Sequence, residues 1–84
     1  MGTIVNISYI ETKVKSIIVE KLGVEEHILI REATFSEHLG ADSLDVLETF
    51  TVIEKEFNIT IKDEDAEKLT TVGSVIDYIN GQKN

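Results

Sequence analysis

The stretch Leu39-Gly40-Ala41-Asp42-Ser43-Leu44-Asp45 decides where the central helix of this 84-residue chain begins. Asp42 is a good N-cap, because its carboxylate can accept a hydrogen bond from a backbone N–H two or three residues further on. Ser43 then stands in the first turn, where free N–H groups and the helix dipole favour a negative group. The heptapeptide therefore predicts a helix start that suits a phosphodiester on the Ser43 hydroxyl.

A helix is predicted over Ser43–Phe57, because apolar residues recur there at helical spacing. Its core face comprises Val46, Phe50, Ile53 and Phe57. The opposite face comprises Leu44, Glu48, Thr51 and Lys55, with Leu47 and Val52 beside it. Apolar residues next to acids on an outer face favour brief contacts with protein partners, although single surface leucines are also common.

The N-terminal part of the chain predicts a first helix over Ser8–Leu22. Ser8 and Glu11 have capping-box spacing, and Gly23 fits the position just after the last turn. The apolar face of this helix comprises Ile10, Val14, Ile17 and Ile18.

The C-terminal part predicts a short third helix over Asp63–Leu69, with acids in its first turn, and a fourth over Val72–Asn80. Thr71 is the expected cap of the fourth helix, and Gly81 is expected to end it. The buried stripe of this helix comprises Val72, Val75, Ile76 and Ile79. The segment Asn58–Lys62 is predicted as a loop, because it is too short for a strand and has no partner strand.

The long connection Val24–Ala41 is too apolar for a free loop, so we expect it to pack over the core. Its apolar residues include Ile28, Leu29, Ile30 and Phe35. Capping-box spacing between Thr34 and Glu37 predicts one helical turn near residues 34–38. The fold class is therefore all-α: a small antiparallel four-helix bundle of three longer helices and one short helix, with a long first connection. Residues 1–84 form one domain, with loose ends at 1–7 and 82–84.

The formal net charge of −8 is unevenly distributed. Residues 1–35 hold four Lys/Arg and five Asp/Glu, whereas residues 36–84 hold four Lys and eleven Asp/Glu. An acidic second half disfavours nucleic acid and anionic membranes as partners and favours basic patches on proteins. No apolar run approaches the length of a membrane span and no signal peptide is recognised, so the cytosol is the simplest location, and a mature organellar protein would have the same features.

Catalysis and metal binding have little support in the sequence. The chain holds no cysteine, and its two histidines lack zinc-ligand spacing. Ser43 lacks the second glycine of a nucleophile elbow, and His27 and His38 both lie in the long connection. We therefore predict neither a catalytic residue nor a metal site.

Five segments together resemble the acyl carrier protein family over nearly the whole length from Ser8 to Gly81. They are the heptapeptide, Leu22-Gly23-Val24, Asp63-Glu64-Asp65-Ala66-Glu67-Lys68, Thr70-Thr71-Val72 and Ile76-Asp77-Tyr78-Ile79-Asn80-Gly81. The resemblance implies that Ser43, flanked by Asp42 and Leu44, carries covalent 4′-phosphopantetheine transferred from coenzyme A. It also implies a carrier that catalyses nothing and presents thioester-linked acyl intermediates to enzymes of fatty-acid or related biosynthesis.

The same resemblance implies a monomer whose partners are a phosphopantetheinyl transferase and acyl-processing enzymes, with the acyl chain as cargo. The residues expected to dock onto basic patches of these partners are Leu44, Leu47, Glu48, Glu54, Asp63, Glu64 and Glu67. Two alternatives stay open: a specialised carrier of polyketide or amino-acyl units, and an unmodified acidic helical interaction module.

Several residues depart from the family pattern: His38, Thr49, Thr51, Lys55 and Lys62. Lys55 in the outer face and His38 before the Leu-Gly pair stand where acids are usual, which favours an altered set of partner enzymes. Thr49 lies near the edge of the core face, where it either makes an acyl cavity more polar or smaller, or bonds back to a helix carbonyl.

Overall fold

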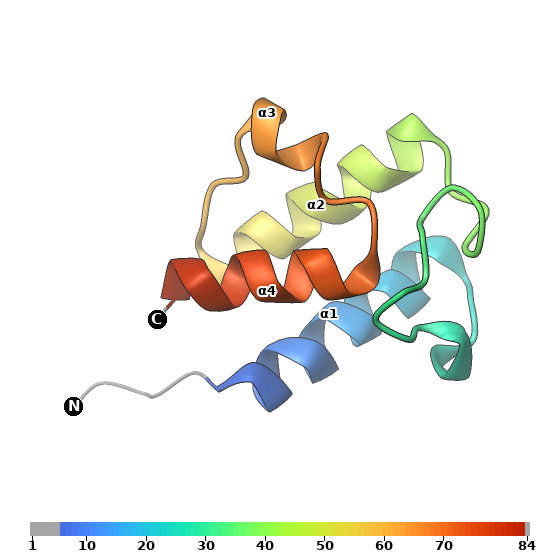
Figure 1. Ribbon diagram of the computed structural model, residues 1–84, viewed down its shortest axis with the longest axis horizontal. Helices are drawn as coiled ribbons and strands as arrows, with labels where there is room; N and C mark the ends of the chain where they lie inside the picture. The colour runs from blue at the N-terminus through green and yellow to red at the C-terminus, as the bar shows by residue number, and fades with distance from the viewer. Residues whose placement is uncertain (1–5, 84) are drawn as a thin grey trace.

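The computed structural model describes residues 6–83, and these form an all-helical bundle. Its elements are α1 (Ile7–Leu22), the short 3-10 helix η1 (Glu26–Ile28), α2 (Ser43–Phe57), α3 (Asp63–Ala66) and α4 (Val72–Lys83). In Figure 1, α1 runs opposite to α2 and α4, and the long connection wraps the end of the bundle where α1 finishes and α2 begins. The predicted fold class, three longer helices and one short helix, is confirmed.

The ends of α1 are set by Asn6 and Gly23. The Asn6 side chain accepts a hydrogen bond from the Tyr9 N–H at 2.9 Å, so the helix starts before Ser8. The predicted Ser8 cap is therefore wrong, because the amide oxygen of Asn6 satisfies the first turn. Gly23 ends the helix as expected, with φ of 67° and its N–H bonded to the Val19 carbonyl.

Only part of the predicted loose ends falls within the described residues. Residues 1–5 and 84 lie outside them. Asn6 and Ile7 belong to the start of α1, and Gln82 and Lys83 belong to α4, so these residues are not loose ends.

The long connection is held to the start of α4 by backbone hydrogen bonds. Thr34 and Thr71 form an isolated antiparallel bridge. The Phe35 N–H donates to the Thr70 carbonyl at 3.1 Å, and the Val72 N–H donates to the Ala33 carbonyl at 3.0 Å. The connection therefore does pack over the core, through Leu29, Ala33, Phe35 and Leu39, which are all buried. Ile30 is the exception to the expectation, since its side chain is 58% exposed.

The turn predicted at residues 34–38 exists, but His38 completes it. The His38 N–H donates to the Thr34 carbonyl at 3.1 Å, which closes one helical turn. In return, the Thr34 N–H donates to His38 Nδ1 at 2.8 Å, in the place where a capping box needs Glu37. His38 stands where the family usually has an acid, and this turn gives the histidine a structural role within the connection.

The last two helices differ from the prediction at their ends. Helix α3 ends at Ala66 rather than Leu69. Helix α4 is capped as expected, because the Ser74 N–H donates to Thr71 Oγ1 and the Thr71 N–H donates to Ser74 Oγ, each at 3.1 Å. Gly81 does not end α4, which continues to Lys83. A glycine in a helix costs only about 1 kcal/mol, which a final exposed turn tolerates.

A tyrosine ties α3 to α4. The Tyr78 hydroxyl donates to the Asp65 carboxylate at 3.0 Å. Burial of the phenol, followed by the hydrogen bond and the charge of Asp65, raises the pKa of Tyr78 above its usual value of 10.0. The hydroxyl therefore keeps its proton at neutral pH and remains a donor to α3.

The core forms where α1 packs against both α2 and α4. All the residues predicted for the apolar faces of α1 and α4 are buried, and so are Phe50, Ile53 and Phe57 of α2. Val46 is only partly buried against this cluster. Thr49 is fully buried, and its hydroxyl donates to the Asp45 carbonyl at 2.8 Å, which satisfies the group without a cavity partner.

Gly73 and Gly81 give a matched test of how closely the connection approaches α4. A Cβ on Gly73 would lie 3.0 Å from both the Cβ and the carbonyl oxygen of Arg31, whose carbonyl already accepts the Gly73 N–H at 2.9 Å. We expect Gly73→Ala to lower the free energy of unfolding by about 1–2 kcal/mol, because overpacking exceeds the gain in helix propensity. Urea unfolding checks this.

Gly81→Ala is the control, since nothing lies within 4 Å of its added Cβ. It should leave stability unchanged or raise it by up to about 1 kcal/mol. Equal responses of the two variants would contradict a close approach at Gly73.

Candidate functional site

Two reciprocal hydrogen bonds place Ser43 at the first position of α2. The Asp45 N–H donates to Asp42 Oδ1 at 2.9 Å, and the Asp42 N–H donates to Asp45 Oδ2 at 3.3 Å. This capping box confirms Asp42 as the N-cap. Ser43 follows directly and is exposed, so its hydroxyl is accessible at a helix end whose N–H groups favour a negative substituent.

The chain enters this site through a tight turn. Gly40 has φ of 65°, in the left-handed region that favours glycine. The Ala41 N–H then donates to the Phe35 carbonyl at 2.9 Å, and the Ala41 side chain is buried. These contacts fix the position of Ser43 relative to Phe35, which comes from the middle of the connection.

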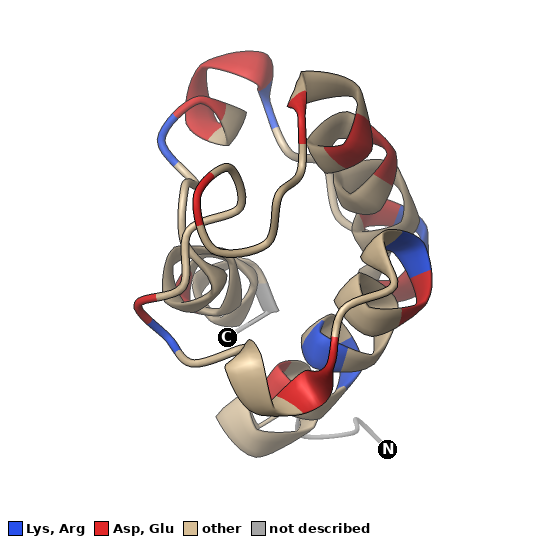
Figure 2. Cartoon of the chain, turned by 90° about the vertical axis from the view of Figure 1, so that its right-hand side faces the viewer, with Lys and Arg blue, Asp and Glu red and all other residues tan. Residues whose placement is uncertain are grey.

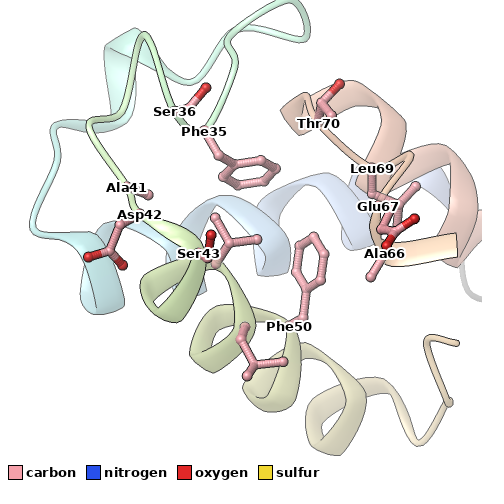
Figure 3. Close-up of a pocket in the computed structure, with 12 residues that line it drawn as sticks. Phe35, Ser36, Ala41, Asp42, Ser43, Phe50, Ala66, Glu67, Leu69 and Thr70 are labelled. Carbon is pink, nitrogen blue, oxygen red and sulfur yellow. The ribbon is translucent and has the colours of Figure 1, made fainter. Parts of the chain in front are cut away.

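Ser43 lies at the edge of a pocket of about 330 Å³ between α2, α3 and the connection. This volume falls in the range of small-molecule sites. Its walls are mostly apolar, and Figure 3 shows the side chains converging on it from three segments of the chain. The lining residues that the site argument uses are Phe35, Val46, Leu47, Phe50, Ala66 and Leu69. Asp42 and Glu67 also border it, so the mouth carries carboxylates.

The residues predicted to dock with partners lie on α2 and α3, mostly at the surface. The side chains of Leu44 and Leu47 are 61% and 59% exposed, although both are hydrophobic. Glu48, Asp63, Glu64 and Glu67 are exposed as well. In Figure 2, acidic residues colour both α3 and the first turns of α2.

Glu54 differs from the other docking candidates. It is half-buried, and its carboxylate accepts a hydrogen bond from the Ile61 N–H at 2.7 Å. This contact closes the loop between α2 and α3. The structure therefore gives Glu54 a role in holding the loop.

The geometry provides no support for nucleophilic catalysis at Ser43. His27 lies within 3.1 Å of Glu25, and the His38 ring contacts Thr34, so each histidine is engaged elsewhere in the connection. Within residues 6–83 no group of three or more His, Cys, Asp or Glu side chains is arranged to hold a metal ion. None of the described helices is long and apolar enough to cross a membrane.

Comparison with known proteins agrees with this geometry. Residues 12–79 match the family model described as the phosphopantetheine attachment site. The chain belongs to the acyl carrier protein family. Its fold is similar to that of an acyl carrier protein from Enterococcus faecalis, described for its high thermal stability, with a TM-score of 0.79 and 35% sequence identity. The match covers 92% of this chain and 98% of the Enterococcus chain.

Membership in this family settles the chemical class. The chain is a non-catalytic carrier with 4′-phosphopantetheine as its covalent prosthetic group. When bound, this group supplies the thiol that holds an acyl chain as a thioester. The residues present fit it: an exposed hydroxyl at a helix N-terminus accommodates the phosphodiester, and an apolar pocket lies beside it.

Sequence reasoning missed most of the pocket. Ser36, Ala66, Leu69 and Thr70 line it, yet none was expected to belong to a site. Phe35 was expected only to pack over the core. The one indication in the sequence was Phe35 itself, because an aromatic residue in the middle of a connection is usually buried. Its presence does not indicate which residues line a pocket with it.

Substitutions at Asp42 and Ser43 test the helix cap and the exposed hydroxyl separately. Asp42→Ala should lower the free energy of unfolding by about 1 kcal/mol, because the Asp45 N–H loses its acceptor. Ser43→Ala should change it by less than about 0.5 kcal/mol, because the side chain is exposed. Urea unfolding of the unmodified proteins measures both, and a larger loss in Ser43→Ala would show that the hydroxyl has a structural role.

Proposed function

We propose that Ser43 is the attachment residue for phosphopantetheine and that the protein carries acyl intermediates of fatty-acid or related biosynthesis. The main observation that supports this proposal is the exposed Ser43 hydroxyl at the capped start of α2, beside an apolar pocket. Family membership supports phosphopantetheine as the prosthetic group, and the position of Ser43 supports this serine as its attachment residue.

Loading is the work of a separate transferase that uses coenzyme A. Ser43 Oγ forms the new bond to phosphorus, the phosphoanhydride bond to the nucleotide breaks, and the hydroxyl proton passes to a base of the transferase. The chain contributes position: Asp42 holds the start of α2, and free N–H groups in the first turn favour the phosphodiester charge.

The pocket beside Ser43 suits an apolar acyl chain. Val46, Leu47 and Leu69 offer aliphatic walls, and burying methylene groups against such walls is favourable by about 0.8 kcal/mol each. The carboxylates of Asp42 and Glu67 border the mouth, which disfavours a cargo that ends in a negative charge. Saturated chains of fatty-acid synthesis therefore fit this lining better than units that end in a carboxylate do.

Partner enzymes dock on a surface that we define by Leu44, Leu47, Glu48, Asp63, Glu64 and Glu67. Exposed leucines beside acids suit transient interfaces with a small apolar centre and charged surroundings. Basic patches on the phosphopantetheinyl transferase and on acyl-processing enzymes complement these acids. Glu54 also belongs to the residues proposed to dock, and its hydrogen bond to the Ile61 N–H holds the loop beside this surface. The carrier acts as a single domain and as a monomer.

Intact mass measurement tests the attachment residue. Wild-type protein incubated with coenzyme A, magnesium and a broad-specificity phosphopantetheinyl transferase should gain one phosphopantetheinyl group, and Ser43→Ala should gain none. Ser36→Ala is a matched control, because Ser36 is another exposed serine at the same pocket and should leave loading intact. Loading of Ser43→Ala would contradict the assignment, and unloaded wild type would favour the unmodified interaction module.

The position of Lys55 supports the proposal that this carrier works with an altered set of partner enzymes. It is exposed on the outer face of α2 and interrupts the acids there. We expect Lys55→Glu to raise the rate of acyl transfer with general fatty-acid synthesis enzymes, and to make that rate fall more steeply with salt. Steady-state kinetics at two ionic strengths measure this.

Lys21→Glu makes the same charge change on α1, where Lys21 is also exposed. A general effect of net charge would change both variants alike. Equal rates for Lys55→Glu and wild type would instead remove Lys55 as a determinant of partner choice.

A further inference from the structure

A pair of aromatic rings lies at the pocket beside Ser43. Phe35 comes from the connection and Phe50 from α2, and their ring centroids are 5.9 Å apart at an interplanar angle of 84°. Both side chains are 3% exposed, and both line the pocket. In Figure 3 the rings lie across the pocket, with Ser43 on one side and Ala66 and Leu69 on the other. Edge-to-face pairs are attractive, so the rings hold each other in place.

The pocket does not reach the aliphatic centre of the bundle. The largest fully buried aliphatic side chains are Ile10, Ile18, Leu29, Ile53, Ile76 and Ile79. None of them belongs to the pocket lining, which instead includes the two rings. Protein interiors are close-packed, so a ligand passes beyond such a boundary only by displacing side chains. The two rings are therefore the bulkiest side chains that bound the pocket, and none of the six aliphatic side chains named above, which we call the isoleucine core, borders it.

We propose that the Phe35–Phe50 pair limits the length of acyl chain that this protein shelters, an inference that rests on the proposed carrier function of Ser43. A saturated chain enters beside Ser43, lies along Val46 and Leu47, which line the pocket, and stops at the ring edges. When the chain is longer than the pocket, the carbons near the thioester that do not fit stay outside the protein, where a partner enzyme can reach them. Removing one ring opens a path toward Ile53 and lengthens the sheltered part.

Thermal unfolding of a chain-length series tests this limit. A phosphopantetheinyl transferase transfers acyl-phosphopantetheinyl groups of increasing saturated chain length from acyl-coenzyme A to Ser43, and mass confirms each product. For wild type, Tm should rise with each added methylene group that becomes buried and then stay constant once the pocket is full. For Phe50→Leu, Tm should start lower but keep rising to longer chains before it levels off.

Phe57→Leu is the matched control. Phe57 is also a buried phenylalanine of α2 in an edge-to-face pair, here with Tyr9 at 6.4 Å and 83°, and it does not line the pocket. It should lower Tm for every chain length without changing the length at which Tm levels off. The same levelling length in Phe50→Leu and wild type would overturn the proposal, and so would an equal shift in Phe57→Leu.

A measurement on the wild type keeps the test independent of variant folding. In the protein loaded with a long saturated chain, nuclear Overhauser effects should connect chain protons to the Phe35 and Phe50 rings but not to the Ile53 methyls. Contacts with Ile53 in the wild type would overturn the length limit. Failure of Ser43 to load would instead overturn the proposed attachment residue, which the mass measurement shows separately.

Discussion

The paired hydrogen bonds between Asp42 and Asp45 fix the first residue of α2, and the geometry of the site depends on that residue. A start displaced by one position would move Ser43 from the first helical position, where free N–H groups and the helix dipole favour a negative group. The buried side chains of Phe50, Ile53 and Phe57 set which face of α2 meets the core. The cap thus determines where Ser43 stands in the helix, and core packing determines the direction of the pocket wall.

The other wall depends on contacts between segments far apart in the sequence. Phe35 belongs to the connection, and its backbone N–H is bonded to the Thr70 carbonyl just before α4. Arg31 reinforces the same junction through its carbonyl bond to Gly73 and its ion pair with Asp77 at 2.6 Å. The ion pair is exposed and adds little stability, so backbone pairing and close packing carry the attachment. The start of α4 therefore positions the pocket although it contributes no side chain to it.

Sequence reasoning succeeded where one local signal dominated. The apolar spacing of α1 and α4 predicted their buried faces, and Asp42, Thr71 and Gly23 were recognised as helix ends. It failed where signals competed or came from distant residues. Asn6 and Ser8 are both good caps, and only the folded chain decides between them. Gly81 is compatible with a helix end or an exposed last turn. The pairing of Thr34 with Thr71 has no periodic signature, so the lining that Phe35 and Thr70 give the pocket was not predictable.

The division of contacts among the helices explains how a small bundle can serve several partners. Helix α1 supplies the packing surface for both α2 and α4, so the core does not need the outer face of α2, and the hydrophobic contribution of α3 is the partly buried Ala66. Leu44 and Leu47 can stay exposed without loss of stability for that reason. Helix α3 has only four residues, none of them fully buried, and Tyr78 links it to α4 through Asp65. Elements with few buried contacts open at low free-energy cost, so α3 can yield at the pocket while the isoleucine core remains intact.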